Sequence, residues 1–294
     1  MSAFDNLNRT IRQGNSVTHL IFINSIVFIL LNIVLSIFKL FNFSADFILS
    51  YLAAPADLVQ LTHRFWTPIT YMFLHEGFFH ILFNMINLYW FGKIFLIFFS
   101  EKKLVGLYIL GGLMGVLFYI IAFNVFPFYS SSLHNSLLLG ASGSIVAIIV
   151  ASAMRSPNME MQLMFIGAIK LKYIALAVFL MSLFGVTSDN GGGQIAHLGG
   201  ALAGYLFVVS LQKGTDITKG INWILDSIFN LFKARKLRVK PNKSKTKMSD
   251  AEYNMNKVNK MAQIDQILDK IKTSGYESLS ADEKKRLFEQ GNKN

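Results

Sequence analysis

The chain has 294 residues, of which 53% are hydrophobic and 15% are charged. Soluble globular domains are about one-quarter charged, so this composition argues against a soluble enzyme and indicates a membrane protein. Cysteine is absent, which excludes disulfide bonds, a thiolate zinc site and a cysteine nucleophile. The formal charge is +11, and most of the excess lies after residue 212.

Six apolar segments predict membrane-spanning helices, because about 20 apolar residues cross a bilayer. The fourth and fifth have only about 16 or 17 residues, so they are expected to end below the membrane surface or to thin the bilayer. No cleavable signal peptide is expected, because the first segment is long enough to span and no cleavage pattern follows it. The segments cover residues 17–38, 78–99, 104–126, 138–154, 171–186 and 195–211.

Lysine and arginine gather in alternate connections between these segments. The side that carries their excess is the cytoplasmic one. This rule places both termini in the cytoplasm and fits a multi-pass protein of a bacterial plasma (inner) membrane. The opposite side has only Lys39 and Arg64 in its connections, and Ser142 lies near that outer face. The cytoplasmic side holds Arg9, Arg12, Lys102, Lys103, Arg155, Lys170, Lys172 and the basic tail.

The connection of residues 42–74 is too long for a simple turn. It contains the stretch HRFWTPITYMF, with Trp66, Tyr71 and several phenylalanines. Aromatic side chains concentrate at the membrane–water interface, and connections of this length are usually functional or ordered in their own right. We therefore expect an ordered interfacial segment here.

Residues 213–294 carry 18 lysines and arginines against 10 acidic residues. Apolar residues at helical spacing first predict an amphipathic helix on the inner leaflet, and a basic linker follows. Beside a membrane, such a tail favours anionic lipid headgroups over nucleic acid as its partner. The apolar positions of the helix are Ile217, Ile221, Ile224, Leu225, Ile228 and Phe232.

A small helical module is predicted at the end of the chain. Its last helix begins with the capping box SADE, from Ser280 to Glu283. The predicted fold class is therefore an all-α membrane protein, a six-helix bundle with an amphipathic helix and a small helical tail. The predicted boundaries are 1–212 for the bundle, 213–247 for the amphipathic helix and linker, and 248–294 for the tail. One apolar face of the module is predicted to hold Ile264, Ile267, Leu268 and Ile271.

A metal site is not predicted, although HEGFFH is similar to a zinc protease signature. That signature places two histidines four residues apart on one helical face. His75 and His80 are five apart, which turns them about 140° away from each other at roughly 100° per residue. We expect neither a metal nor another cofactor.

His80 and Asn84 are four residues apart and therefore share one helical face. Both lie in the outer part of the second segment, where their side chains can donate hydrogen bonds to a common point. Hydrogen bonds that hold neighbouring helices together are the alternative role.

Ser142 and His197 begin the fourth and sixth segments, and both are expected near the outer face. Small residues recur every four positions beside each of them, which lets two helix backbones approach closely. A serine hydroxyl within reach of an imidazole is the minimum nucleophile–base pair. From these two residues alone, a packing role is the favoured interpretation. The small residues are Gly143, Ala147 and Ala151 in one segment and Ala196, Gly200 and Gly204 in the other.

Four motifs taken together resemble the rhomboid intramembrane serine proteases. They occur in the family's order along a six-segment body and are HRFWTPITYMFLH, HEGFFHILFN, GASG and AHLGGALAG. The resemblance implies that Ser142 is the nucleophile and His197 the general base, acting as a dyad. It also implies that His80 and Asn84 stabilise the oxyanion.

The resemblance further implies a substrate class, namely single-span membrane proteins that are cut in or near their membrane segment. One departure concerns the fourth position after the serine, where the family commonly has an aromatic residue that stacks on the histidine. Val146 occupies this position and cannot stack. It is the one feature that favours the alternative of a catalytically silent relative that binds membrane clients. Because the nucleophile, the base, Asn84 and His80 are all present, an active endopeptidase is the leading interpretation. A transporter would predict internal repeats, and the sequence shows none.

Overall fold

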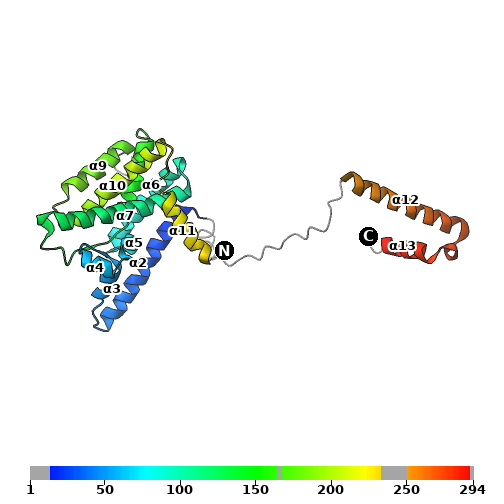
Figure 1. Ribbon diagram of the computed structural model, residues 1–294, viewed down its shortest axis with the longest axis horizontal. Helices are drawn as coiled ribbons and strands as arrows, with labels where there is room; N and C mark the ends of the chain where they lie inside the picture. Colours follow the sequence, from blue (N-terminus) through cyan, green and yellow to red (C-terminus); the bar gives the residue numbers. More distant parts are fainter. Residues whose placement is uncertain (1–13, 164–166, 233–249, 292–294) are drawn as a thin grey trace. The chain divides into compact units, whose positions relative to one another are not determined.

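The computed structural model describes residues 14–163, 167–232 and 250–291. It divides into two compact units, Met1–Lys233 and Ala234–Asn294 (Figure 1). The three-part division at residues 212 and 247 stays a prediction. Each unit is described by itself below.

The larger unit is built on six apolar helices. Among the described residues, α2, α6, α7 and α10 are long and apolar enough to cross a membrane, whereas α8 and α9 have 14 residues each. The prediction of an all-α, multi-pass membrane bundle is confirmed. The six helices are α2 (Ser16–Leu40), α6 (Phe78–Phe98), α7 (Glu101–Val125), α8 (Ser142–Arg155), α9 (Leu171–Phe184) and α10 (Gly191–Gln212).

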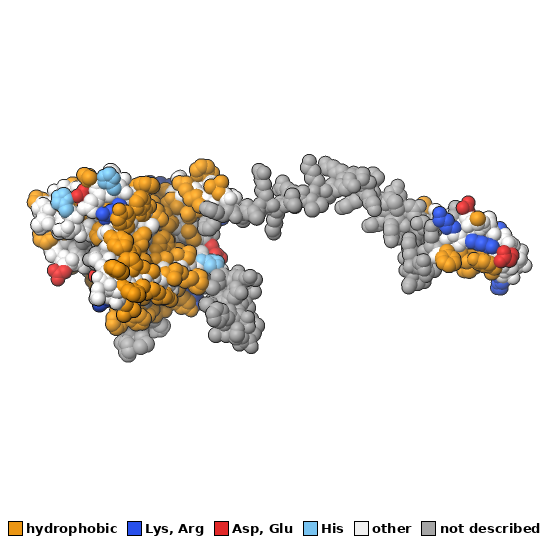
Figure 2. Space-filling view, turned by 90° about the horizontal axis from the view of Figure 1, so that it is seen from below, with side chains coloured by type: hydrophobic (Ala, Val, Ile, Leu, Met, Phe, Trp, Pro, Cys, Tyr) orange, Lys and Arg blue, Asp and Glu red, His pale blue; other side chains and the backbone are white. Residues whose placement is uncertain are grey.

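The surface of this unit is largely apolar, as expected for a protein surrounded by lipid. Figure 2 shows hydrophobic side chains covering much of one face. On α2, Ile29, Leu30 and Ile33 are each more than half exposed. Exposure of this kind would be unfavourable in water and is neutral against lipid tails.

Small residues bring α7, α8 and α10 into backbone contact at the centre of the bundle. A Cβ atom on Gly200 would overlap the carbonyl oxygen of Gly143, and one on Gly204 would overlap that of Ala147. On α7, a Cβ on Gly111 would lie 2.6 Å from that of Ala147. The predicted close approach of the fourth and sixth segments is therefore confirmed, and α7 joins them.

The connection of residues 42–74 is ordered, as predicted. Its short strand pairs antiparallel with a second strand in the connection between α7 and α8, so that Ala54 faces Leu138 and Pro55 faces Leu137. The elements of residues 42–74 are α3 (Asp46–Leu52), β1 (Ala54–Pro55), α4 (Leu58–His63), α5 (Thr67–Thr70) and the 3₁₀ turn η1 (Tyr71–Phe73). The connection between α7 and α8 contains the 3₁₀ turn η2 (Pro127–Tyr129) and β2 (Leu137–Leu138).

Two further strands lie between α8 and α9, a connection for which the sequence analysis made no structural prediction. They are β3 (Glu160–Leu163) and β4 (Gly167–Lys170), and they pair antiparallel. The fourth predicted segment also begins too early, because α8 starts at Ser142 and not at residue 138. Residues 137–138 are paired in β2, and Gly140 has a φ of 122°, which no helix contains.

A hydrogen bond between Asp57 and His134 links the two paired connections. The Asp57 carboxylate lies 2.5 Å from Nδ1 of His134 and also accepts a hydrogen bond from the backbone N–H of Val59 at 2.7 Å, which caps α4. The hydrogen bond from His134 is the main cause that lowers the pKa of Asp57, helped by the backbone donors and opposed by burial. Asp57 thereby links β1 and α4 to the connection that precedes β2.

This pair predicts a loss of stability in acid. A carboxylate whose pKa is lowered by folding stabilises the protein above its unfolded pKa of about 3.9, and this contribution disappears as the pH falls through the lower, folded value. Native protein is therefore expected to melt at a higher temperature than Asp57→Asn at pH 7, with the difference shrinking below about pH 4. Thermal melts in detergent across this range test it. Asparagine also caps helices, so equal melting at pH 7 would contradict a stabilising role for the contact between Asp57 and His134.

The helix after the bundle is α11 (Lys219–Phe232), as the apolar spacing predicted. It packs against the start of α7, where Lys102 and Asp226 form an ion pair of 2.6 Å and a Cβ on Gly106 would lie 2.7 Å from Thr218. Trp223 and Leu231 are 71% and 83% exposed, so the helix keeps an open apolar face. The basic residues predicted to follow, 233–247, lie outside the described residues.

The smaller unit contains α12 (Asp250–Ser274), η3 (Tyr276–Ser278) and α13 (Ala281–Gly291). The predicted capping box is confirmed: Ser280 N–H donates to the Glu283 carboxylate at 2.7 Å, and Glu283 N–H donates to the Ser280 hydroxyl at 3.3 Å. Of the predicted apolar face, Ile267 is buried but Leu268 is 48% exposed. Lys270 closes the hairpin with an ion pair of 3.0 Å to Glu283.

Candidate active site

Ser142 is the first residue of α8, and a rigid turn presents it. Gly140 N–H donates to the carbonyl oxygen of Tyr71 at 2.9 Å, and β2 holds the chain just before it. The Gly140 φ of 122° is a conformation that side-chain-bearing residues rarely adopt. Ser142 therefore sits at a helix N-terminus, where unpaired N–H groups and the positive end of the helix dipole favour negative charge.

Ser142 lines a cavity of about 930 Å³. Its other lining residues include His80 of α6, Tyr119 of α7 and residues 188–193, which comprise the end of the glycine-rich loop and the first residues of α10. More than half of its lining residues are polar or glycine, in contrast to the apolar outer surface of the bundle. The arrangement provides a polar space, large enough for several water molecules, in front of the serine.

The imidazole of His80 lies beside the turn that carries Ser142. A Cβ built on Gly140 would be 2.9 Å from Nε2 of His80 and 3.8 Å from the Ser142 hydroxyl oxygen. Glycine at 140 therefore leaves the space that the ring occupies. The backbone N–H of Glu76 makes a long contact of 3.5 Å with Nδ1 of His80. An N–H can only donate, so in the neutral ring Nε2 carries the hydrogen and is a donor at this point.

Asn84 follows His80 by one turn and is buried. Its amide nitrogen donates to the backbone carbonyl of His80 at 2.8 Å. An amide nitrogen has two hydrogens, so one remains for another acceptor. Within the described residues, His80 lines the cavity together with Ser142, and Asn84 lies outside its lining.

His75 is buried next to His80, with the two rings edge to face and their centres 5.1 Å apart. Burial, followed by the proximity of His80, lowers the pKa of His75 to about 4. His75 is therefore neutral at ordinary pH and packs against His80.

His197 lies on α10 at the place where that helix touches α8. A Cβ on Gly143 would lie 3.2 Å from the carbonyl oxygen of Ala196, so the direct neighbours of Ser142 and His197 are in contact. Ser142 and His197 are far apart in the sequence. Contacts at the glycines of α8 and α10 bring the two helices together. In the part of the chain that the structure describes, the His197 ring bonds Ser182 and not Ser142. Catalytic hydrogen bonds are often loose without substrate.

Ser182 is the site residue that the sequence analysis missed. Its hydroxyl oxygen lies 3.2 Å from Nδ1 of His197. The available signal was a single serine in the apolar run VFLMSLF near the outer end of the fifth segment. Val146, one turn after Ser142, is buried and contributes no polar group.

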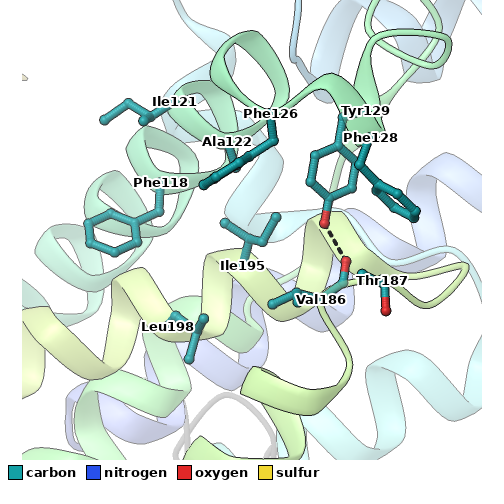
Figure 3. Close-up of a pocket in the computed structure, with 10 residues that line it drawn as sticks. All are labelled: Phe118, Ile121, Ala122, Phe126, Phe128, Tyr129, Val186, Thr187, Ile195 and Leu198. Atoms are coloured by element: carbon teal, nitrogen blue, oxygen red, sulfur yellow. Dashed lines mark hydrogen bonds between the residues drawn. The ribbon is translucent and has the colours of Figure 1, made fainter.

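A second pocket, of about 500 Å³, lies beside the polar cavity and is apolar (Figure 3). Phe118 and Ala122 of α7 line it opposite Ile195 and Leu198 of α10. Tyr129 lines both spaces, and its hydroxyl donates to the carbonyl oxygen of Val186. Tyr129 thus links η2 to the connection that follows α9 and separates the two spaces.

The chain is similar to known proteins over the part that contains these residues. The model described as Rhomboid domain matches residues 62–213, which include Ser142, His197, His80 and Asn84. A family of unknown function, DUF6576, matches residues 248–293. RHOMBOID-like protein 12, mitochondrial, of Arabidopsis thaliana is 31% identical over 162 residues, which cover 51% of this chain and 48% of that protein. The chain thus spans about half the length of this relative.

Proposed function

Because the chain belongs to the rhomboid family, we propose that it is an intramembrane serine endopeptidase with Ser142 as nucleophile and His197 as general base. The observation that carries the proposal is the position of Ser142. It stands at the N-terminus of α8, beside the donor His80, in a polar cavity within an apolar bundle. Backbone contact between α8 and α10 supports the pairing with His197.

The proposed reaction begins with attack of the Ser142 hydroxyl oxygen on the peptide carbonyl carbon while Nε2 of His197 takes the hydroxyl proton. The C–N bond then breaks, the amine leaves with the proton from His197, and an acyl-enzyme remains. Water from the polar cavity attacks this ester, gives its proton to His197 and releases the carboxylic acid. Ser142 recovers its proton in that step.

Negative charge develops on the carbonyl oxygen during both attacks. Nε2–H of His80 and the backbone N–H of Ser142 are fixed donors at this place, and the second amide hydrogen of Asn84 is the third candidate. Each oriented donor in a water-poor site stabilises such a charge by about 3–4 kcal/mol. The positive end of α8 acts in the same direction.

The proposed substrates are single-span membrane proteins. A helical peptide bond is inaccessible to attack, so the substrate segment must unwind near the site, which helix-breaking residues favour. The positive-inside pattern supports a bacterial plasma membrane with both termini in the cytoplasm; the relative's name places that plant protein in mitochondria. For the basic tail and the open apolar face of α11, we propose anionic lipid headgroups as the partner.

The test is cleavage of a single-span reporter by purified protein in liposomes. Native protein and Ser144→Ala are expected to cut the reporter, and Ser142→Ala is not. Ser144 is the matched control because it lies two residues further along α8, is 1% exposed and has a hydroxyl without a hydrogen-bond partner among the described residues. Equal cleavage by all three would refute the assignment of Ser142. Cleavage by none, across several reporters, would favour the client-binding alternative.

A further inference from the structure

Ser182 differs from the rest of α9. Its neighbours Met181 and Phe184 are 71% and 78% exposed, whereas Ser182 is 2% exposed. Leu171, at the other end, is the only other buried residue of this helix. In the half of α9 near the site, the buried side chain is therefore a hydroxyl.

The hydroxyl meets the imidazole of His197 at Nδ1, at a distance of 3.2 Å. A neutral imidazole has one nitrogen that donates and one that accepts. If Nδ1–H donates to Ser182, the lone pair is on Nε2, which is the form that can take a proton from Ser142. The opposite arrangement leaves Nε2 protonated and unable to act as a base.

We propose that Ser182 is the positioning residue that holds His197 in its base-competent tautomer and orientation. The proposal rests on the proposed function. The base thus receives its orientation from α9, while the nucleophile comes from α8. Within α8, the side chain one turn from Ser142 is Val146, which has no group to direct an imidazole. Ser182 instead orients the imidazole through a hydrogen bond to Nδ1.

The variants are Ser182→Ala, which removes the acceptor, and Ser182→Thr, which keeps a hydroxyl at the same place. A neutral hydrogen bond contributes about 0.5–1.5 kcal/mol, which corresponds to a factor of roughly 2 to 13 in rate. In liposomes, Ser182→Ala is expected to lower kcat about tenfold with KM unchanged, and Ser182→Thr to restore most of it. Ser152→Ala is the control, because Ser152 is fully buried in α8 and its hydroxyl has no partner among the described residues.

The second readout is the tautomer itself, measured by NMR on the full chain labelled with ¹⁵N-histidine. The His197 signals are assigned by their loss in His197→Gln. Native protein is expected to show a protonated Nδ1 and an unprotonated Nε2, and Ser182→Ala a mixture of the two forms. A structural role alone would not change this ratio.

The two readouts separate the two proposals. If Ser142→Ala abolishes cleavage while Ser182→Ala leaves kcat and the tautomer unchanged, the role of Ser182 is refuted and the protease function stands. If native protein does not cleave but Ser182→Ala still shifts the tautomer, Ser182 positions His197 and the protease function fails. A loss of kcat that Ser182→Thr does not restore, with an unchanged tautomer, also refutes the proposal.

Discussion

Alanine at His197 is expected to reduce kcat as far as alanine at Ser142 does, by about 10⁴-fold or more, and the double variant no further. A nucleophile and its base act as one unit, so removing either removes the proton transfer and the covalent route together. Native protein, the two single variants and the double variant are compared on one reporter, with single-turnover rates measured in liposomes.

The pattern of the effects is more informative than their size. Two independent sites would give losses that multiply in the double variant. A multiplied loss, or a His197→Ala variant that keeps more than about one-tenth of the native rate, would contradict a shared mechanism. His75→Ala provides a histidine control outside the dyad, and its own effect reports on the packing around His80.

The substitution Gly200→Ala is expected to disrupt the candidate active site, although residue 200 is not one of the proposed reacting groups. Its Cβ would overlap the carbonyl oxygen of Gly143, and a backbone atom cannot turn away as a flexible side chain can. Overpacking of this kind costs about 1–3 kcal/mol of stability, and a displacement of 1 Å at a catalytic site can cost about 100-fold in rate. Both a lower unfolding temperature and at least a 100-fold slower cleavage are expected.

The matched control is Gly220→Ala in α11. A Cβ at Gly220 has no atom within 4 Å, and alanine favours helix over glycine by about 1 kcal/mol. Gly220→Ala is therefore expected to leave cleavage unchanged and stability equal or slightly higher. Native activity in Gly200→Ala would show that contact between α8 and α10 does not set the geometry of the dyad.

The sequence predicted the helices well because a membrane helix leaves a simple signal, a run of apolar residues as long as the bilayer is thick. The close approach of α8 and α10 was predictable for a related reason, since small residues at every fourth position have few other uses in a bundle. The capping box at Ser280 was predictable because its partners are three residues apart. These are all local or repeating patterns.

The remaining features depend on residues far apart in the chain. Pairing of Ala54 with Leu138 joins two-residue strands that have no periodicity to detect, and it delays the start of α8 to Ser142. Ser182 was missed because a lone serine in an apolar run is usually a packing residue; only the approach of His197 on α10 gives it a partner. The roles of His80 and Asn84 rested on the family resemblance, and the geometry distinguishes them, since His80 alone lines the cavity.

The length of α8 bears on how deep Ser142 lies in the bilayer. Its 14 residues extend about 21 Å at roughly 1.5 Å per residue, against a hydrocarbon core of about 30 Å. An α8 that stands upright with Arg155 at one headgroup layer would leave the Ser142 hydroxyl about 9 Å below the opposite one. Under the proposed function, the depth of cleavage is then set from the Arg155 side of the membrane. Bilayer thickness, which varies with lipid composition, would therefore help to decide which peptide bond is cleaved.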